Sequence, residues 1–211
     1  WLTEPYTTGP EGAGYRGHAT VDLEAAYRFA LAAFDEGHQL LCHCNGDAAS
    51  DAYMDLVERA MRESTNPHKQ ELKPVMIHCQ FARRDQYERM HALGMIPSIF
   101  VAHTWYWGDA HIANMGMGRA SEISRVHDAL ELGLPFTFHT DSPVIEPNLF
   151  ESVWCAATRI TRAGVQLDPA QRVGIYDGLQ AVTVNAAAQY GEQHRKGTLE
   201  VGKLADLAIV E

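Results

Sequence analysis

The chain has 211 residues, of which 46% are hydrophobic and 21% are charged, a composition typical of a folded globular protein. The formal net charge of −10 argues against nucleic acid or an anionic membrane surface as the main partner. No run of about 18 apolar residues is present, so the sequence predicts no membrane-spanning helix. Four cysteines are too few for a disulfide scaffold in a chain of this length, and we interpret them as reduced core residues of a cytoplasmic protein.

The first half of the chain predicts helices and strands in alternation. A loop over residues 1–20 precedes a helix whose apolar residues recur at helical spacing. Asp47 stands where it can cap the second helix. The predicted elements are a helix at 22–34, a strand at 39–44, a helix at 48–63, a strand at 74–80 and a helix at 83–93.

The second half continues the alternation. The stretch 104–118 is aromatic and Gly-rich, and we interpret it as an active-site loop. The remaining predicted elements are a strand at 95–102, a helix at 121–132, a short apolar strand that begins near Pro135, helices at 148–162 and 170–190, and strand-like alternation with Gly turns at 196–211. Four strand–helix pairs in succession favour an α/β fold of parallel βα units. Such units make half of an eight-stranded barrel or a small open sheet.

Polar side chains follow each of the four predicted strands. They are His43, His78, His103, and the pair His139 and Asp141. Because the carboxyl ends of parallel strands meet at one edge of a sheet, we expect these side chains to lie near one another. Two neutral imidazoles and a carboxylate suit a borderline hydrolytic metal such as zinc. Taken singly, each histidine is also compatible with a satisfied core residue.

Asp141 allows three interpretations. A carboxylate at a strand end can bind a metal, act as a general base, or cap the turn before Pro143. In a metal site it can serve twice, because a carboxylate has a second oxygen left free to take a proton from water and deliver it to a leaving nitrogen.

Four stretches, in this order, resemble the motifs of the metal-dependent amidohydrolase superfamily, in the branch similar to N-substituted formamide deformylase. They are HCNGDA at 43–48, IHCQ at 77–80, TDSPV at 140–144 and KGTLEVGKLADL at 196–207. The resemblance implies that His43, His78 and Asp141 bind a divalent metal, with zinc favoured, as one or two ions. It also implies that Asp141 is the catalytic proton shuttle.

The resemblance places four further residues on the substrate side of the site: His103, Trp107, His111 and His139. His103 and His111 are candidate oxyanion stabilisers or substrate contacts, with loop packing among the aromatic residues as the alternative. His139 stands where many relatives have Gly, and we expect it to orient Asp141 or to line the pocket.

The resemblance also predicts the domain organisation. Residues 1–195 correspond to the C-terminal half of a TIM (β/α)₈ barrel, and 196–211 to strands that return to a small β-sandwich. The family's first-strand His-x-His and its metal-bridging lysine or glutamate are not in this chain. A half-barrel has two unpaired edges, so we expect a homo-oligomer or association with an N-terminal half.

The implied function is a metal-dependent hydrolase that cleaves the C–N bond of an amide, cyclic amide or formamide-like small molecule. The alternative is an inactive or regulatory fragment that keeps the fold. A flavodoxin-like phosphate site is disfavoured, because Asp47 follows Asn45-Gly46 where a phosphate would bind.

Overall fold

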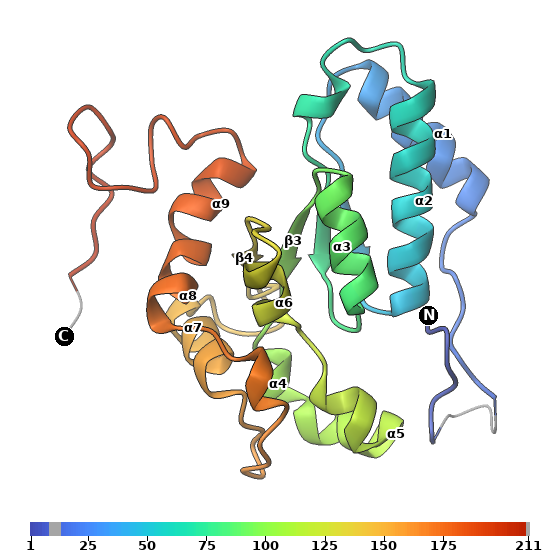
Figure 1. Ribbon diagram of the computed structural model, residues 1–211, viewed down its shortest axis with the longest axis vertical. Helices are drawn as coiled ribbons and strands as arrows, with labels where there is room; N and C mark the ends of the chain where they lie inside the picture. Colours follow the sequence, from blue (N-terminus) through green and yellow to red (C-terminus); the bar gives the residue numbers. More distant parts are fainter. Residues whose placement is uncertain (9–13, 210–211) are drawn as a thin grey trace.

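The centre of the fold is a parallel sheet. The computed structural model describes residues 1–8 and 14–209, and in these ranges the strands pair in the order β1-β2-β3-β4 (Figure 1). The strands are β1 (Leu41–Cys44), β2 (Val75–His78), β3 (Ile96–Ile99) and β4 (Thr137–Phe138), and every pair is parallel. The predicted βα units are therefore confirmed, and the sequential strand order is the order of half a (β/α)₈ barrel.

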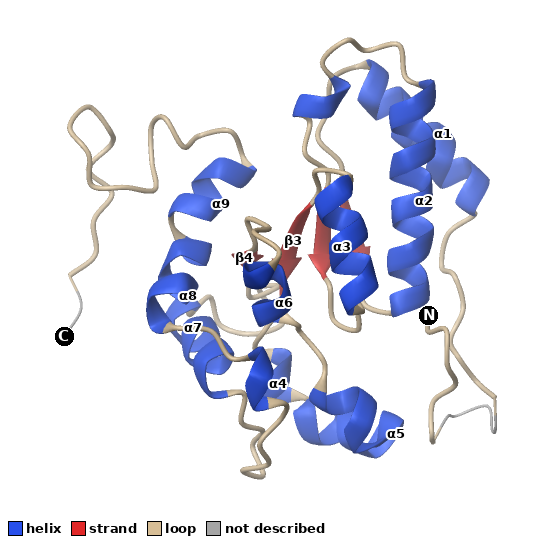
Figure 2. Ribbon diagram, viewed as in Figure 1, coloured by secondary structure: helices blue, strands red, loops and turns tan. Residues whose placement is uncertain are grey.

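Three helices from the first half of the chain lie on one side of the sheet (Figure 2). They are α1 (Leu23–Asp35), α2 (Asp47–Glu63) and α3 (Arg84–Ala92), with a 3₁₀ turn, η1 (Lys69–Glu71), before β2. Helix α2 contacts β1, α3 contacts β3, and α1 packs against α2. Asp22 caps α1 through a bond from the amide of Ala25. The prediction that Asp47 caps α2 is wrong: Gly46 is the N-cap, and the Asp47 carboxylate instead accepts hydrogen bonds from Thr3 and Arg83.

The stretch 104–118 is helical, and its interpretation as a loop is wrong. It forms α4 (His103–Tyr106) and most of α5 (Gly108–Ser121), which lie beyond the carboxyl ends of the strands (Figure 1). Gly116, with φ of 79°, puts a kink into α5. The glycines suggested a loop, but Gly108 is required by packing, since a Cβ there would lie 2.6 Å from Cγ2 of Thr161.

The remaining helices lie on the β4 side. They are α6 (Val126–Glu131), α7 (Leu149–Thr158), η2 (Pro169–Gln171), α8 (Ile175–Val182) and α9 (Val184–Gln189). The single helix predicted for 170–190 is wrong, because Thr183 has φ −123° and ψ −90° and separates α8 from α9. Residues 196–209 contain turns and no strand, and residues 210 and 211 lie outside the described part. The assignment of this tail to a β-sandwich stays a prediction.

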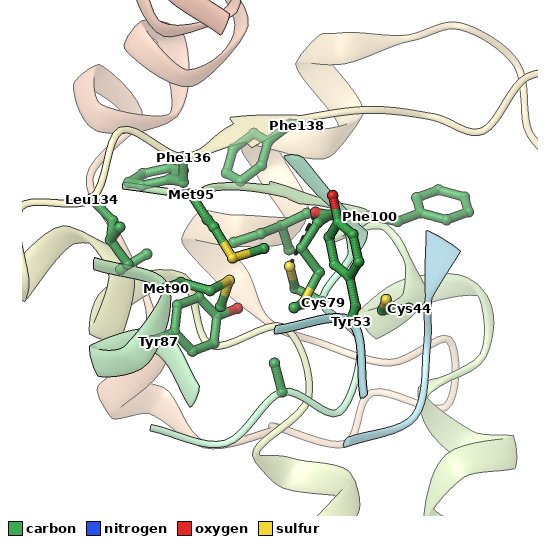
Figure 3. Close-up of a cluster of buried hydrophobic side chains, with 14 of the residues drawn as sticks. Cys44, Tyr53, Cys79, Tyr87, Met90, Met95, Phe100, Leu134, Phe136 and Phe138 are labelled. Carbon is green, nitrogen blue, oxygen red and sulfur yellow. Dashed lines mark hydrogen bonds between the residues drawn. The ribbon is translucent and has the colours of Figure 1, made fainter. Parts of the chain in front are cut away.

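The hydrophobic core fills the space between the sheet and its helices. Figure 3 shows side chains from the strand regions, such as Cys44 and Phe138, packed with Tyr53 of α2 and with Tyr87 and Met90 of α3. All four cysteines are free thiols; Cys44, Cys79 and Cys155 are buried in the core, and Cys42 is half-buried. No helix in the described ranges is both long and apolar enough to cross a membrane.

Candidate metal centre

Three residues converge beyond the ends of β2 and β4. His78, His139 and Asp141 each offer one ligand atom, and these atoms all lie within 4.8 Å of one another. His78 is the buried last residue of β2, whereas His139 and Asp141 follow β4 and Asp141 is exposed. Two imidazoles and a carboxylate at this spacing are a donor set that fits a divalent metal ion.

Two of these residues have a left-handed backbone. The φ angle is 79° at His78 and 51° at Asp141, and Cys79, with φ of 51°, continues the turn after His78. Residues other than Gly rarely adopt this conformation, which costs on the order of 1 kcal/mol each and is common at functional sites. The backbone thus turns sharply at both positions that supply ligand atoms.

The side chain of Asp141 does not cap the turn before Pro143. Its backbone carbonyl accepts a hydrogen bond from the amide of Val144 at 2.8 Å. Within residues 1–8 and 14–209, its carboxylate forms neither a hydrogen bond nor an ion pair, although it approaches His78 and His139. Both of its oxygens are therefore available for a ligand.

A chain of hydrogen bonds crosses the ends of all four strands. His78 is its centre: Nε2 lies 2.8 Å from Nδ1 of His43, and Nδ1 lies 3.1 Å from Nε2 of His139. At one end, Nδ2 of Asn45 lies 3.2 Å from Nε2 of His43. At the other end, Oγ of Ser98 lies 3.2 Å from Nδ1 of His139.

The terminal asparagine sets the direction of this chain. An amide nitrogen can only donate, so with this side-chain orientation Nε2 of His43 accepts and its Nδ1–H donates to His78. By the same reasoning His78 donates to His139, and His139 donates to the Ser98 hydroxyl. All three imidazoles are satisfied as neutral rings.

Burial keeps the rings of His78 and His139 neutral. Desolvation, reinforced by the neighbouring His43, lowers the pKa of His78 to about 4, while Asp141 partly opposes this shift. Desolvation, with His78 and His43 nearby, lowers the pKa of His139 to about 3. Neutral imidazole is the form that binds metal, so both residues are ready to act as ligands near neutral pH.

His43, predicted as a ligand, contacts His78 but lies outside the group of three converging residues. It is exposed at the end of β1, whose far edge has no strand neighbour in the described ranges. His139, predicted to orient Asp141 or to line the pocket, is one of the three and also lines the neighbouring cavity. The ligand role of His43 stays a prediction.

The predicted substrate residues of the aromatic stretch form a second group. Nδ1 of His103 lies 3.2 Å from Nε2 of His111, and the ring of Trp107 lies 4.5 Å from that of His103. Phe100 separates this group from the metal centre, with ring centroids 4.7 Å from His103 and 5.2 Å from His139. The two histidine groups therefore share one aromatic wall.

Sequence reasoning missed Ser98 and Asn45. Ser98 lies in β3 between Ile77 of β2 and Thr137 of β4 in the sheet register. A polar residue inside an otherwise apolar strand was the available signal for Ser98. Asn45 lies inside the HCNGDA motif, and its position two residues after His43 brings it within reach of that ring.

A cavity of about 450 Å³ opens beside the centre. Asp141, His139 and Ser98 supply its polar side, whereas Ile77, Phe138, Leu149 and Tyr190 are among its apolar lining residues. This volume lies in the range typical of small-molecule sites.

Fold and site together define a half-barrel α/β protein with a candidate metal centre at the carboxyl ends of its strands. The chain belongs to the Amidohydrolase family, whose model matches residues 1–211. It is 28% identical over 178 residues to N-substituted formamide deformylase of Arthrobacter pascens, covering 83% of this chain and 32% of that protein. It is 27% identical over 209 residues to Protein LONG AFTER FAR-RED 3 of Arabidopsis thaliana, covering 98% and 35%. The chain thus spans about a third of the length of these relatives.

Solved structures show the same fold. A metal-dependent hydrolase from Pyrococcus furiosus superposes with a TM-score of 0.79 at 24% identity, covering 97% of this chain and 39% of its own. A second, from Pyrococcus horikoshii, gives a TM-score of 0.78 at 24% identity, with the same coverage. These likenesses confirm the fold class as the C-terminal half of a (β/α)₈ barrel.

Proposed function

We propose that this chain is the metal-binding half of a hydrolase that cleaves the C–N bond of an amide-type small molecule. The observation that carries the proposal is the convergence of His78, His139 and Asp141 within 4.8 Å. Family membership supports hydrolysis in general, and the curated relative from Arthrobacter pascens is a deformylase of N-substituted formamides. We take this substrate class as the first to test.

His78, His139 and Asp141 would bind the ion, with His43 as a further ligand once its contact with His78 is broken. A bound divalent ion, zinc by preference for this donor set, polarises a carbonyl and lowers the pKa of water. Asp141 supplies the base, because one of its oxygens stays free to take a proton and deliver it to the leaving nitrogen. The cavity of about 450 Å³ would receive the acyl group or the substituent on nitrogen.

The proposed enzyme includes a second half-barrel beside this chain. In the described ranges β1 and β4 each have one strand neighbour, so each leaves one edge of the sheet open. Beside β1, Leu41 is 46% exposed and Phe29 of α1 is 73% exposed. Such edges favour association, either with another copy of this chain or with an N-terminal half.

Formate release tests the proposed function. The zinc-loaded protein, at concentrations at which its half-barrels associate, is incubated with a series of N-substituted formamides and acetamides, and formate, acetate and amine are quantified. We expect turnover that EDTA abolishes and added zinc restores. Zinc binding without turnover on any amide would favour the alternative of a non-catalytic member of the family.

A further inference from the structure

The turn after β2 is strained at the residue that supplies a candidate metal ligand. His78 has φ of 79° and Cys79 has φ of 51°, so two consecutive residues other than Gly are left-handed. Such residues cost free energy and persist only where surrounding contacts hold them. The chain before the turn is fixed, because His78 pairs with Ile99 of β3 and its carbonyl accepts a hydrogen bond from the amide of Phe100. The orientation of the His78 side chain therefore depends on what holds the chain after Cys79.

Gln80 is held at two points by one residue, Ser124. The amide of Ser124 donates to the carbonyl of Gln80 at 3.0 Å, and Nε2 of Gln80 donates to Oγ of Ser124 at 3.1 Å. Both residues are buried, with Gln80 at 1% and Ser124 at 0% exposure. Two bonds between the same two residues fix both the position and the orientation of the chain at Gln80. The left-handed turn is thus closed between β2 and this anchor.

Ser124 is itself fixed by a buried arginine. Nη1 of Arg159 donates to the carbonyl of Ser124 at 2.9 Å. Its Nη2 donates to the carbonyls of Ile123 at 2.7 Å and Ser121 at 3.0 Å. Arg159 is fully buried, and hydrogen bonds from a cation are stronger than those between neutral groups. Ser124 is therefore a rigid support for Gln80.

An unpaired atom argues that Gln80 has a role other than stability. Its Oε1 is buried and has no hydrogen-bond partner among the described residues. A buried unpaired oxygen is unfavourable, and it offsets what the bond from Nε2 contributes. Gln86 of α3, also 1% exposed, is a matched contrast: its Oε1 accepts from the amide of Arg83, and its Nε2 donates to the carbonyl of Asp47. The amide of Gln86 therefore stabilises the fold more than that of Gln80.

We propose that Gln80 and Ser124 are positioning residues of the metal centre, an inference that rests on the proposed function. Their contact keeps the left-handed turn closed, and the turn keeps the imidazole of His78 within reach of His139 and Asp141. Without the contact, the turn relaxes toward ordinary backbone angles and the ring of His78 moves away from the other two ligands. Both residues act through the backbone rather than by touching the ion.

Methionine substitutions at the two buried glutamines test the proposal. Gln80→Met keeps the length of the side chain and removes its bond to Ser124. We expect its zinc affinity to fall about 10-fold while its midpoint of urea unfolding changes little. Gln86→Met removes both bonds of the matched residue, so it should lower the urea midpoint and leave zinc affinity unchanged. Chelator competition measures affinity at a temperature at which circular dichroism shows every variant to be folded.

Ser124→Gly removes the other partner of the contact. Gly adopts the φ of 50° at this position freely, so only the hydroxyl is lost and the amide still bonds the carbonyl of Gln80. We expect this variant to weaken zinc binding as much as Gln80→Met does. Native zinc affinity in both variants would overturn the positioning role.

Ring ¹⁵N NMR of the metal-free protein gives a readout that needs no zinc. Nδ1–H of His78 donates to His139 in the native chain, so its signal should exchange slowly with solvent. Gln80→Met should speed this exchange, and Gln86→Met should not. Equal exchange rates in the native chain and in Gln80→Met would show that Gln80 does not orient the ring.

The outcomes separate the two proposals. If the native chain binds zinc and hydrolyses amides, and Gln80→Met binds zinc as tightly, the positioning role is wrong and the hydrolase proposal stands. If Gln80→Met weakens zinc binding but the native chain hydrolyses no amide, the positioning role stands and the hydrolase proposal is overturned. If the native chain binds no zinc, both are overturned.

Discussion

Nδ1 of His78 lies 3.1 Å from Nε2 of His139, so the two imidazoles that the Asp141 carboxylate approaches are hydrogen-bonded to each other. A metal ion that uses one of these nitrogens replaces this hydrogen bond. The ion therefore competes with an internal contact rather than with water alone. This competition makes the affinity of the site sensitive to each partner in the histidine chain.

Substitutions at His78 and Asp141 should affect zinc binding and turnover to different extents. We expect His78→Ala to weaken zinc binding at least about 100-fold, because the central ligand is lost. Asp141→Asn should keep more of the affinity while losing far more turnover, because the amide cannot accept the proton. Competition with a chromogenic chelator measures affinity, and formate release measures turnover. His91→Ala, at an exposed position of α3, is the control, and similar small effects in both site variants would contradict the assigned roles.

The Ser98 hydroxyl should matter although it is not a ligand. It accepts the hydrogen bond from Nδ1 of His139 and so leaves Nε2 of that ring free of a proton. We expect Ser98→Ala to reduce zinc affinity about 10-fold, the lower end of the range for such supporting contacts. Ser121→Ala removes a hydroxyl that, among the described residues, bonds only the carbonyl of Gly118, and it should leave affinity unchanged. Equal affinities for the two variants would show that Ser98 does not fix the ring.

The metal-free protein should lose stability in weak acid. The pKa values of His78 and His139 in the fold, about 4 and 3, lie below the value of about 6.5 in the unfolded chain. Between these values the unfolded state binds more protons, so stability is full above pH 6.5 and falls as the pH drops toward 4. We expect the free energy of unfolding to fall by on the order of 5 kcal/mol over this window, with about half from each histidine. Urea titrations at several pH values measure it, and a constant value from pH 7 to 4 would contradict the burial of neutral rings.

Gly46 should not tolerate a side chain. A Cβ at this position would lie 1.8 Å from the carbonyl oxygen of Trp1, so the segment that Thr3 anchors to Asp47 would have to move. We expect Gly46→Ala to lower Tm by several degrees and to speed amide exchange at Leu2 and Thr3. Gly118→Ala, where a Cβ meets nothing within 4 Å in a helix, should instead stabilise by about 0.5–1 kcal/mol. Unchanged exchange at Thr3 in Gly46→Ala would refute the clash.

The open sheet edge should drive association. We expect the molecular mass from sedimentation to rise with concentration above the 23.4 kDa of one chain. Leu41→Lys should shift the protein toward the monomer, because a lysine at a strand edge opposes pairing. Val201→Lys changes an exposed residue of the tail and should leave the equilibrium unaltered. A monomer at millimolar concentration would contradict this prediction.

The sequence predicted the strand–helix units better than the segments that follow the carboxyl ends of the strands. Strands β1 to β3 and helices α1 to α3 follow from apolar spacing and Gly punctuation, because local pattern and burial agree there. Helices α4 and α5 were missed since Gly108 and Gly116 resemble loop residues, although Gly108 is required by the nearby Thr161. At Gly108 the local sequence therefore favours a loop, whereas tertiary packing requires a glycine within a helix.

The sequence predicted where the site residues lie, at the ends of the strands, but not which of their side chains contact one another. Strand ends identified His78, Asp141 and His139 as neighbours, but the left-handed backbone at His78 and Asp141 has no sequence signal in residues other than Gly. Which imidazole converges with Asp141 depends on those angles. The sequence predicted His43 as a ligand and His139 as a residue of the substrate side, whereas the three groups that converge belong to His78, His139 and Asp141.

Phe100 connects the metal centre to Trp107 by ring contacts. Its ring contacts His78, His139, His103 and Trp107, with centroid separations between 4.7 and 6.0 Å. A ligand that reorients either metal-centre imidazole must change the packing of this ring, which the indole of Trp107 also contacts. Metal loading should therefore be visible in tryptophan fluorescence and in the ring-current shifts of His103, two optical and magnetic signals from residues that never touch the ion.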